Sequence, residues 1–482
     1  MTAALKFPTN ALIDGQWVSG TKSFAVTNPA TGETLAHVPD LGAHEARQAI
    51  DAAARALPAW SAKPAKERAQ ILRKWFDLMI AETESLAHLM TSEQGKPLAE
   101  ARGEVAYGAS FAEWFAEEGK RAYGKTIPTT MASKRYITIK QPIGVVAAIA
   151  PWNFPIAMIT RKVAPALAAG CTIVVKPAED TPLCALAIAK LALDAGVPGG
   201  VFNVITTQDA PAVGKVLCDD SRVRKLSFTG STGVGKALYR QCADTVKKLT
   251  LELGGNAPLI VFDDANLEQA VAGAMASKYR NAGQTCVCAN RILVQRGIYD
   301  RFAAALVEAV KKLEVGPGSN PKCNLGPLIN KDAIDKVSTL TCDAIAKGAT
   351  VLYGGQPHGA GTLFFTPTVL GNITPDMDLV GEEIFGPVAA LMPFDTEAQA
   401  IELANSTPFG LAAYLFSTSL SRAWRVAEKI EAGMIGVNEG IFSNEVVPFG
   451  GVKESGLGRE GAAEGLEEYL ETKYLCLGGI DA

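Results

Sequence analysis

The chain has 482 residues and a formal net charge of −4. Hydrophobic residues make up 48% and charged residues 20%, as in ordinary globular proteins, so general disorder is excluded. The length predicts about three domain-sized units. The slightly acidic balance argues against a nucleic-acid partner, which usually binds a basic protein.

The cysteines and the N-terminal residues predict a cytoplasmic protein. Nine cysteines are too few for a disulfide scaffold, and an odd number cannot all pair within one chain. The first residues, MTAALKFPTNALIDG, lack the basic and apolar runs of a secretory signal. Residues 141–160 are uncharged, but Pro142, Pro151 and Pro155 would break a membrane helix there. We therefore expect no membrane partner, and a short buried strand over 145–149 followed by a loop.

Hydrophobic periodicity predicts helices in the first third of the chain and alternating strands and helices afterwards. The early helices are expected over 43–57, 65–92 and 98–121. A first series of buried strands is expected over 145–149, 172–176, 202–205, 225–229 and 248–253, with helices over 182–195 and 233–243. A second series comprises strands over 258–262 and 291–295 and helices over 266–280 and 298–313. This alternation is typical of parallel, doubly wound α/β sheets. The strand-like tail EYLETKYLCLGG is expected to join another subunit.

Two residues beside these strands suit nucleophilic chemistry. Cys286 lies in NAGQTCVC, a polar segment between a helix and a strand, where a thiolate can reach a substrate. The alternative is a buried structural thiol. Glu252 ends a strand just before two glycines, at the edge where α/β sheets bind ligands. The alternative is a glutamate that faces water.

Two further segments suit cofactor and oxyanion binding. The Gly-rich turn FTGSTGVG at 228–235 joins a strand to a helix, where main-chain N–H groups can hold a phosphate. The glycine spacing of this turn is not the usual G-x-G-x-x-G, so the turn alone is weak evidence for a phosphate site. Asn153 lies between two prolines in PWNFP, which suits a rigid amide donor to an oxyanion, although a simple turn is the alternative.

The composition also excludes other mechanisms. The four histidines all lie far from Cys286 in sequence, which argues against a Cys–His hydrolase. No His or Cys cluster has zinc spacing, so no metal is expected. The base that serves Cys286 is therefore expected to be a carboxylate.

Together these segments make the chain similar to a known family. The motifs PWNFP, KPAEDTP, SFTGSTGVGK, LELGGNAP, RNAGQTCVCANR, EEIFGP and PFGGVKESGLGREG resemble the aldehyde dehydrogenase superfamily, in order from about residue 12 to the C-terminus. ITRK at 159–162, YRNAGQTCVC at 279–288 and SNEVVPFGG at 443–451 most resemble the sub-family that oxidises succinate semialdehyde.

The resemblance implies an aldehyde dehydrogenase-like α/β fold with a Rossmann-type cofactor domain, an α/β catalytic domain and a small β oligomerisation element. The NAD-binding domain would take residues 1–123 and 143–252, and the catalytic domain 253–437. Residues 438–462 would return to the cofactor domain. Residues 124–142 and 463–482 would form the oligomerisation element of a homodimer or homotetramer.

The resemblance also implies the roles of the catalytic residues. Cys286 would attack the aldehyde carbon, and the Asn153 amide with the Cys286 main-chain N–H would hold the oxyanion. Hydride transfer to the nicotinamide would leave a thioester, which water activated by Glu252 would hydrolyse.

The cofactor residues follow from the same resemblance. Lys176 and Glu179 would hold the adenosine ribose, and Glu383 the nicotinamide ribose. The residues expected to support the pyrophosphate or flank the nicotinamide are Trp152, Gly230, Ser231, Gly235 and Phe385. A carboxylate at Glu179 accepts bonds from a free 2′-hydroxyl but repels a 2′-phosphate, so NAD is expected to be preferred, with NADP possible.

The substrate would carry a carboxylate at its far end. Arg161 and Arg280 match the family's carboxylate-binding arginines, and Ser443 matches a supporting hydroxyl. The alternative for each arginine is a structural ion pair. Glutarate semialdehyde, one methylene longer, is the nearest alternative substrate. Alternatives of other classes are a non-catalytic binding protein on the same fold and a thioester hydrolase.

Cys288 is a candidate partner of Cys286 in a redox switch. It follows Cys286 by two residues, so a disulfide would need a bent, movable loop. The alternative is a small packed residue behind the site.

Overall fold

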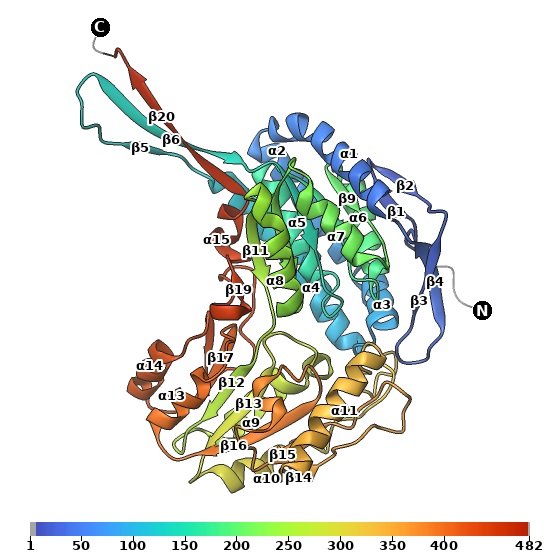
Figure 1. The fold of residues 1–482 in the computed structure, drawn as a ribbon, viewed down its shortest axis with the longest axis vertical. Helices are drawn as coiled ribbons and strands as arrows, with labels where there is room; N and C mark the ends of the chain where they lie inside the picture. Colours follow the sequence, from blue (N-terminus) through green and yellow to red (C-terminus); the bar gives the residue numbers. More distant parts are fainter. Residues whose placement is uncertain (1–5, 481–482) are drawn as a thin grey trace.

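Two large mixed β-sheets and a projecting three-stranded sheet organise the chain in the computed structural model, which describes residues 6–480 (Figure 1). The first large sheet and its helices form the upper half of the view. The second large sheet, built from the later part of the chain, forms the lower half.

The first sheet has eight strands in the order β19-β11-β10-β7-β8-β9-β1-β2. The five strands from β11 to β9 run parallel. β19 pairs antiparallel with β11 at one edge, and at the other edge β1 pairs antiparallel with β9 and β2 pairs antiparallel with β1. The strands are Ala11–Ile13 (β1), Gln16–Val18 (β2), Val145–Ile149 (β7), Thr172–Lys176 (β8), Phe202–Val204 (β9), Val223–Thr229 (β10), Lys248–Glu252 (β11) and Gly456–Leu457 (β19).

Helices cover both faces of this sheet because its central strands are apolar on both faces. Val146 and Val175 pack in one core with helices α2 to α6, whereas Val145 and Val174 pack on the other side with α1, α7 and α8. The helices are Ala43–Ser61 (α1), Ala65–Ala81 (α2), Thr83–Gln94 (α3), Leu98–Glu118 (α4), Ala157–Ala169 (α5), Pro182–Ala195 (α6), Ala210–Asp219 (α7) and Thr232–Cys242 (α8).

Local sequence sets the ends of the helices that follow β7 and β8. α5 ends at Gly170 and α6 at Gly196, both with positive φ (96° and 105°), which glycine adopts without steric cost. α6 begins with Pro182, whose fixed φ suits the first helical position. These short, well-defined connections return the chain to the sheet.

The second sheet has seven strands in the order β14-β15-β16-β13-β12-β17-β18, parallel except for the edge strand β14. Its strands are Ala257–Val261 (β12), Ala289–Gln295 (β13), Thr350–Tyr353 (β14), Thr368–Gly371 (β15), Val388–Phe394 (β16), Ala412–Phe416 (β17) and Met434–Val437 (β18). Its helices are Leu267–Tyr279 (α9), Tyr299–Val310 (α10), Lys331–Ala346 (α11), Asp378–Gly381 (α12), Glu397–Asn405 (α13) and Leu420–Lys429 (α14).

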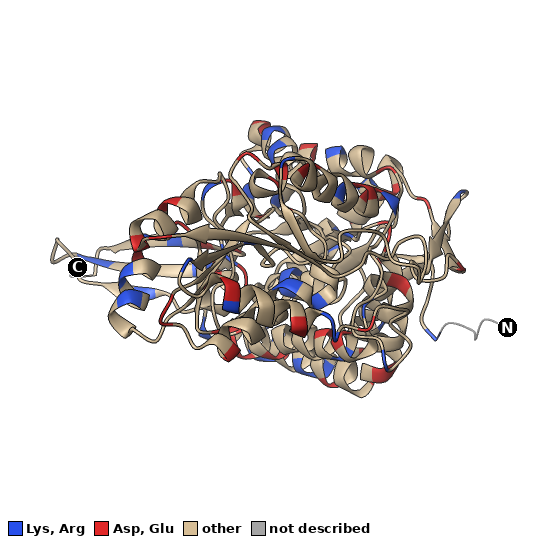
Figure 2. Ribbon diagram, turned by 90° about the horizontal axis from the view of Figure 1, so that it is seen from below, with Lys and Arg blue, Asp and Glu red and all other residues tan. Residues whose placement is uncertain are grey.

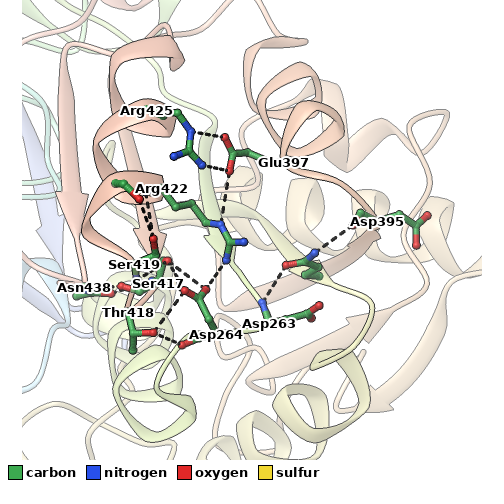
Figure 3. Close-up of polar contacts among 12 residues, drawn as sticks. Asp263, Asp264, Asp395, Glu397, Ser417, Thr418, Ser419, Arg422, Arg425 and Asn438 are labelled. Atoms are coloured by element: carbon green, nitrogen blue, oxygen red, sulfur yellow. Dashed lines mark hydrogen bonds and ion pairs between the residues drawn. The ribbon is translucent and has the colours of Figure 1, made fainter.

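A polar network fastens α13 and α14 to the end of β12 (Figure 3). Arg422 of α14 donates to the Asp264 carboxylate at 2.6 Å and lies 3.5 Å from Glu397 of α13. Asp264 also accepts from the Ser417 hydroxyl.

The remaining strands form a hairpin and an arm. β3 (Ser23–Thr27) pairs with β4 (Thr34–Pro39). The arm, formed by β5 (Lys125–Ile127), β6 (Lys134–Pro142) and β20 (Leu470–Gly478), projects from the body (Figure 1). The short elements are Gly119–Arg121 (η1), Ala243–Thr245 (η2), Arg280–Gly283 (η3), Lys453–Ser455 (η4) and Ala462–Glu467 (α15).

The α/β prediction is confirmed, but the N-terminal third differs from the helical expectation. Strands β1 to β4 precede α1, and the helix expected over 65–92 is two helices that break at Glu82. Strands of three residues, such as β1 and β2, are too short to show an alternating pattern. The helix expected over 98–121 ends at Glu118 and continues as a single tighter turn.

Charged residues of both signs are interspersed over the molecule (Figure 2). Among the residues that the structure describes, no helix is long and apolar enough to cross a membrane.

Candidate active site

The carboxyl ends of four parallel strands meet at one edge of the first sheet. Ile149 pairs with Lys176 and Phe228, and Thr229 pairs with Glu252. The loops that follow these strands therefore emerge side by side, as ligand-binding loops do in α/β sheets. Asn153, Ser231 and Glu252 reach the same region in this way.

Two cavities meet at Cys286. The larger, about 460 Å³, is lined by most of the predicted cofactor and catalytic residues, namely Trp152, Asn153, Gly230, Ser231, Glu252, Cys286, Glu383 and Phe385. The smaller, about 270 Å³, is lined by Arg161, Arg280, Cys286 and Ser443 among others. A thiol at the junction can face a cofactor on one side and a substrate on the other.

The segment before Cys286 has an unusual backbone. Asn281, Ala282 and Gly283 all have positive φ (51°, 55° and 75°), which turns the chain sharply between α9 and β13. Gly255 allows this segment to approach the first sheet, because a Cβ there would lie 2.3 Å from the Cys286 carbonyl oxygen. Burial raises the pKa of the Cys286 thiol to about 12.

Asn153 contacts the cysteine segment directly. Its side-chain Nδ2 donates to the main-chain oxygen of Gln284 at 3.0 Å. An amide NH₂ has two N–H groups, so the second remains available to another acceptor. The geometry suits a donor aimed at an oxyanion on Cys286.

Glu252 is a buried carboxylate without a hydrogen-bond partner on either oxygen among the described residues. Burial, reinforced by the nearby Glu460 carboxylate, raises its pKa well above the ordinary value. A carboxylate with a raised pKa on the wall of the larger cavity is suited to accept a proton from water.

Arg161 and Arg280 both line the smaller cavity, but their surroundings differ. Arg161 is buried and donates from Nε and Nη2 to one oxygen of Glu460, at 2.8 and 2.6 Å. Arg280 lies 5.4 Å from the centre of the Phe154 ring, and its side chain forms no ion pair with any described residue. Arg280 is therefore the arginine of this cavity that no carboxylate holds in an ion pair, although the buried Glu100 carboxylate on the same cavity interacts with its charge. The hydroxyl of Ser443 lies on the wall of the same cavity.

Aromatic rings and a carboxylate shape the larger cavity beside Cys286. The Trp152 and Phe385 rings meet edge to face, with centroids 5.5 Å apart. Glu383 Oε1 accepts from the Gly255 main-chain N–H at 3.1 Å. Burial raises the pKa of Glu383 to about 7. Its second oxygen remains available to a ribose hydroxyl.

The Gly-rich turn places the N-terminus of α8 at the larger cavity. Ser231 caps α8 by accepting from the Val234 N–H at 3.4 Å, and Gly230 lines the cavity beside it. Gly235 lies inside α8 instead, where a Cβ would be 2.4 Å from a Leu253 methyl group. Gly230 and Ser231 thus suit a phosphate, whereas Gly235 packs the helix against the sheet.

Lys176 and Glu179 lie beyond the larger cavity. Lys176, at the end of β8, forms an ion pair with Glu179 at 2.8 Å, and the Glu179 side chain is 47% exposed. Burial acts to raise the pKa of Glu179, but the Lys176 ammonium outweighs it and the pKa is lowered. A charged carboxylate therefore stands at this position.

Cys288 is buried behind the site. Its thiol donates to the Lys278 main-chain oxygen at 3.4 Å, and its N–H donates to the Thr285 oxygen at 3.1 Å. The second bond closes a turn over 285–288, so the segment that joins the two cysteines is bent. All nine cysteines are free thiols.

Sequence reasoning missed a group of polar residues that α4 and the turn before it bring to the smaller cavity. Lys96, Glu100, Glu104 and Tyr107 line its wall. A signal was present, because Glu104 lies on the apolar face of α4 that also carries Ala101, Val105 and Ala112. A carboxylate on an apolar helix face indicates a buried polar contact. The described residues hold no cluster of three His, Cys, Asp or Glu side chains that suits a metal ion.

The fold and the two cavities, which share a cysteine thiol, are those of an α/β oxidoreductase. Residues 17–475 match the sequence profile of the aldehyde dehydrogenase family, and the chain belongs to that family. Membership of the family makes this chain an enzyme of the aldehyde dehydrogenase class. Members of the family use NAD(P) as the cofactor.

Individual relatives match almost the whole chain. It is 60% identical over 474 residues, 98% of each chain, to the succinate-semialdehyde dehydrogenase [NADP(+)] GabD of Escherichia coli. It is 57% identical over 476 residues, again 98% of each, to a glutarate-semialdehyde dehydrogenase of Pseudomonas aeruginosa. The crystal structure of a succinate-semialdehyde dehydrogenase from Burkholderia pseudomallei superposes with a TM-score of 0.98 at 57% identity, covering 99% of this chain and 100% of that chain.

Proposed function

We propose that the protein oxidises succinate semialdehyde to succinate with NAD(P)⁺ and water, releasing NAD(P)H. The observation that carries this proposal is the position of Cys286 between a cofactor-sized cavity and a cavity lined by two arginines. The likeness to enzymes named succinate-semialdehyde dehydrogenase supports the same substrate.

The proposed reaction begins at Cys286. The thiol gives its proton to the Glu252 carboxylate on the same cavity, which passes the proton to solvent, and the thiolate attacks the aldehyde carbon to form a tetrahedral adduct. The second N–H of the Asn153 amide and the Cys286 main-chain N–H hold the oxyanion, and loss of one such donor typically costs ~10²–10³ in rate. The chemistry supplied by bound NAD(P)⁺ is acceptance of hydride from the adduct. A thioester then remains on Cys286.

Glu252 completes the proposed cycle. Its raised pKa lets it take a proton from a water molecule that attacks the thioester, which releases the acid and the free thiol. Because both its oxygens are free of partners among the described residues, either can face that water.

The larger cavity fits the cofactor in its chemistry. The N-terminus of α8 at Gly230 and Ser231 suits a pyrophosphate, and the free oxygen of Glu383 suits a ribose hydroxyl. Trp152 and Phe385 offer flat apolar surfaces beside Cys286. Lys176 and Glu179 would bind the adenosine ribose.

We propose that NAD is preferred over NADP. The exposed, ionised carboxylate of Glu179 would repel a 2′-phosphate, which carries negative charge. The relative from Escherichia coli is named as an NADP enzyme and so does not support a preference for NAD. The proposed preference of this chain for NAD rests on Glu179 alone.

The substrate carboxylate would bind at the far end of the smaller cavity. Arg280 offers an unpaired guanidinium, with Arg161 and the Ser443 hydroxyl on the same wall. Glutarate semialdehyde is the second candidate, because a relative that is 57% identical carries that name. One methylene group is worth only ~1–3 kcal/mol of discrimination.

We also propose that the chain assembles through its arm into a homodimer or homotetramer. β20 lies at the edge of the arm, and its apolar residues Tyr474, Leu475 and Leu477 are 58%, 36% and 44% exposed. An exposed apolar edge strand favours pairing with another chain. Leu475→Lys with Leu477→Lys should then lower the mass measured by light scattering. The free cysteines fit the reducing cytoplasm as the proposed location.

One assay tests the proposed function. The absorbance of reduced cofactor is followed with succinate semialdehyde, glutarate semialdehyde and butanal, each with NAD⁺ and with NADP⁺. We expect the highest kcat/KM for succinate semialdehyde with NAD⁺. A higher value for butanal would refute the proposed substrate class. Absence of reduced cofactor with every aldehyde would favour a non-catalytic protein or a thioester hydrolase.

A further inference from the structure

A buried ion pair between Lys96 and Glu104 lies against the loop that carries Asn153. Both side chains are only 1% exposed. The Lys96 ammonium also donates to the main-chain oxygen of Asn153 at 2.8 Å and lies 4.0 Å from the centre of the Phe154 ring. The donors of Lys96 are therefore committed to this loop and to Glu104.

Glu104 holds the same loop at a second point. Its Oε1 accepts from the main-chain N–H groups of Ile156 and Ala157, at 3.0 and 3.3 Å, while Oε2 faces Lys96. These N–H groups belong to the first turn of α5, which has no carbonyl partners for them. The ion pair thus fixes the main chain on both sides of Pro155.

Stability alone does not account for this pair. Removing two charges from water is unfavourable, and a buried ion pair often stabilises a fold no better than apolar residues of similar volume. What apolar residues cannot supply is the set of hydrogen bonds that Lys96 and Glu104 form with the loop.

The position of Asn153 depends on this main chain. Its Nδ2 reaches the Gln284 oxygen at 3.0 Å, across the gap between the two large sheets. The Asn153 main-chain oxygen, which accepts from Lys96, also accepts from the Asn281 side chain at 3.0 Å. A shift of the loop would move the free N–H of Asn153 away from Cys286, and an error of about 1 Å in such a position can cost ~10²-fold in rate.

We propose that Lys96 and Glu104 are positioning residues that hold Asn153 so that its amide faces the oxyanion on Cys286. Neither residue touches the reacting atoms in this proposal. The inference rests on the proposed roles of Asn153 and Cys286.

The test is a double-mutant cycle with Asn153→Ala. Lys96→Met combined with Glu104→Leu removes both charges of the ion pair, so neither partner is left without the other. If the pair acts through Asn153, this variant should lower kcat by ~10²-fold when Asn153 is present, and by less than about threefold in Asn153→Ala. KM for the cofactor should stay within about twofold of wild type. Equal fold-losses in the two backgrounds, or an unchanged kcat, would overturn the proposal.

A milder variant covers the case in which the paired replacement does not fold. Glu104→Gln keeps an acceptor for the Ile156 and Ala157 N–H groups but loses the charge that pairs with Lys96. It should lower kcat by ~10-fold, again only when Asn153 is present. Lys225→Met is the matched control, because Lys225 is also fully buried and pairs with Glu468 away from both cavities. Its kcat should stay within about twofold of wild type. An equal loss in Lys225→Met would mean that burial of a lysine, not Asn153, is what matters.

A second readout separates this inference from the proposed substrate. Cleavage of p-nitrophenyl acetate by Cys286 needs the nucleophile and the oxyanion donor but neither cofactor nor semialdehyde. The same non-additive pattern is expected in the ester assay. If succinate semialdehyde is not oxidised but the ester cycle is non-additive, the proposed function fails and the role of Lys96 and Glu104 stands. If the ester cycle is additive, the positioning role fails.

Discussion

Arg161 and Glu460 form a buried ion pair across 299 residues of sequence, with both hydrogen bonds of Arg161 on one carboxylate oxygen. Lys162 contacts the other oxygen. The nearby carboxylate raises the pKa of Arg161, although burial acts in the opposite direction. Arg161 is thus held in a buried ion pair, whereas Arg280 forms no ion pair with a described residue, so the two arginines should respond differently to substitution.

Arg280→Gln should raise KM for succinate semialdehyde by ~10–100-fold, because it removes a charged donor to the substrate carboxylate. KM for butanal and the thermal midpoint should change little. Arg161→Gln should also lower the free energy of unfolding, on the order of 3 kcal/mol, because it breaks a buried pair. Steady-state kinetics and thermal unfolding of both variants check this. Equal increases in KM for both aldehydes in Arg280→Gln would show that Arg280 does not bind the carboxylate.

Glu179→Ser should shift the cofactor preference towards NADP. The change removes the negative charge that would face the 2′-phosphate and frees Lys176, its ion-pair partner, to contact that phosphate. We expect the ratio of kcat/KM for NADP⁺ to that for NAD⁺ to rise by ~10-fold or more. Measuring the ratio at fixed succinate semialdehyde decides the point, and an unchanged ratio would place cofactor selectivity elsewhere.

Glu93 should make the stability of the protein fall as pH rises. Burial raises its pKa to about 7, although hydrogen bonds from the Cys184 side chain and from the Leu183 and Cys184 N–H groups favour the charged form. The folded state then binds the Glu93 proton more tightly than the unfolded state, which stabilises the fold at low pH. This stabilisation, about 3 kcal/mol, is lost as the pH rises from the unfolded pKa to the folded pKa.

Glu93→Gln carries no such proton and should gain stability relative to wild type as pH rises. Urea unfolding of both proteins at pH 5, 6.5 and 8 measures the difference. A difference in free energy of unfolding that does not change with pH would contradict the raised pKa of Glu93.

Cys288 should make oxidative inactivation reversible. Hydrogen peroxide would oxidise the Cys286 and Cys288 thiols to a disulfide with release of water, and the bent segment over 285–288 brings the two residues into one turn. Wild type should lose activity and regain it with a thiol reductant. Cys288→Ala should either resist this loss or lose activity permanently. Identical loss and recovery in the two proteins would exclude Cys288 from the switch.

The buried strands and the loops after them could be predicted from the sequence because each signal is local. Residues 145–149 and 173–175 are continuous apolar runs, and the structure places strands over 145–149 and 172–176. The loops that follow these strands carry Asn153 and Glu179. Because the strands are parallel, both loops could be predicted to lie at the same edge of the sheet. The short strands β1 and β2 gave no such signal.

Contacts between distant segments could not be predicted in the same way. Arg161 was assigned to the substrate from family resemblance, and only the fold shows that Glu460 accepts its hydrogen bonds. Helical periodicity predicts which face of α4 is buried but not what it meets, so the contact of Lys96 with Asn153 was missed. The positive φ of Asn281 and Ala282 likewise depends on packing between the two sheets.

The central claim is that oxidation proceeds through a thioester on Cys286 that Glu252 helps water to hydrolyse. Glu252→Gln keeps the shape of the side chain but cannot take the proton. Mixed with NAD⁺ and succinate semialdehyde, this variant should form about one reduced cofactor per active site in a rapid burst and then turn over ~10²-fold more slowly than wild type. Intact-mass spectrometry of the stopped reaction should show a succinyl group on Cys286, absent in Cys286→Ala. Steady turnover at the wild-type rate, or a burst without a succinyl group on Cys286, would contradict the account.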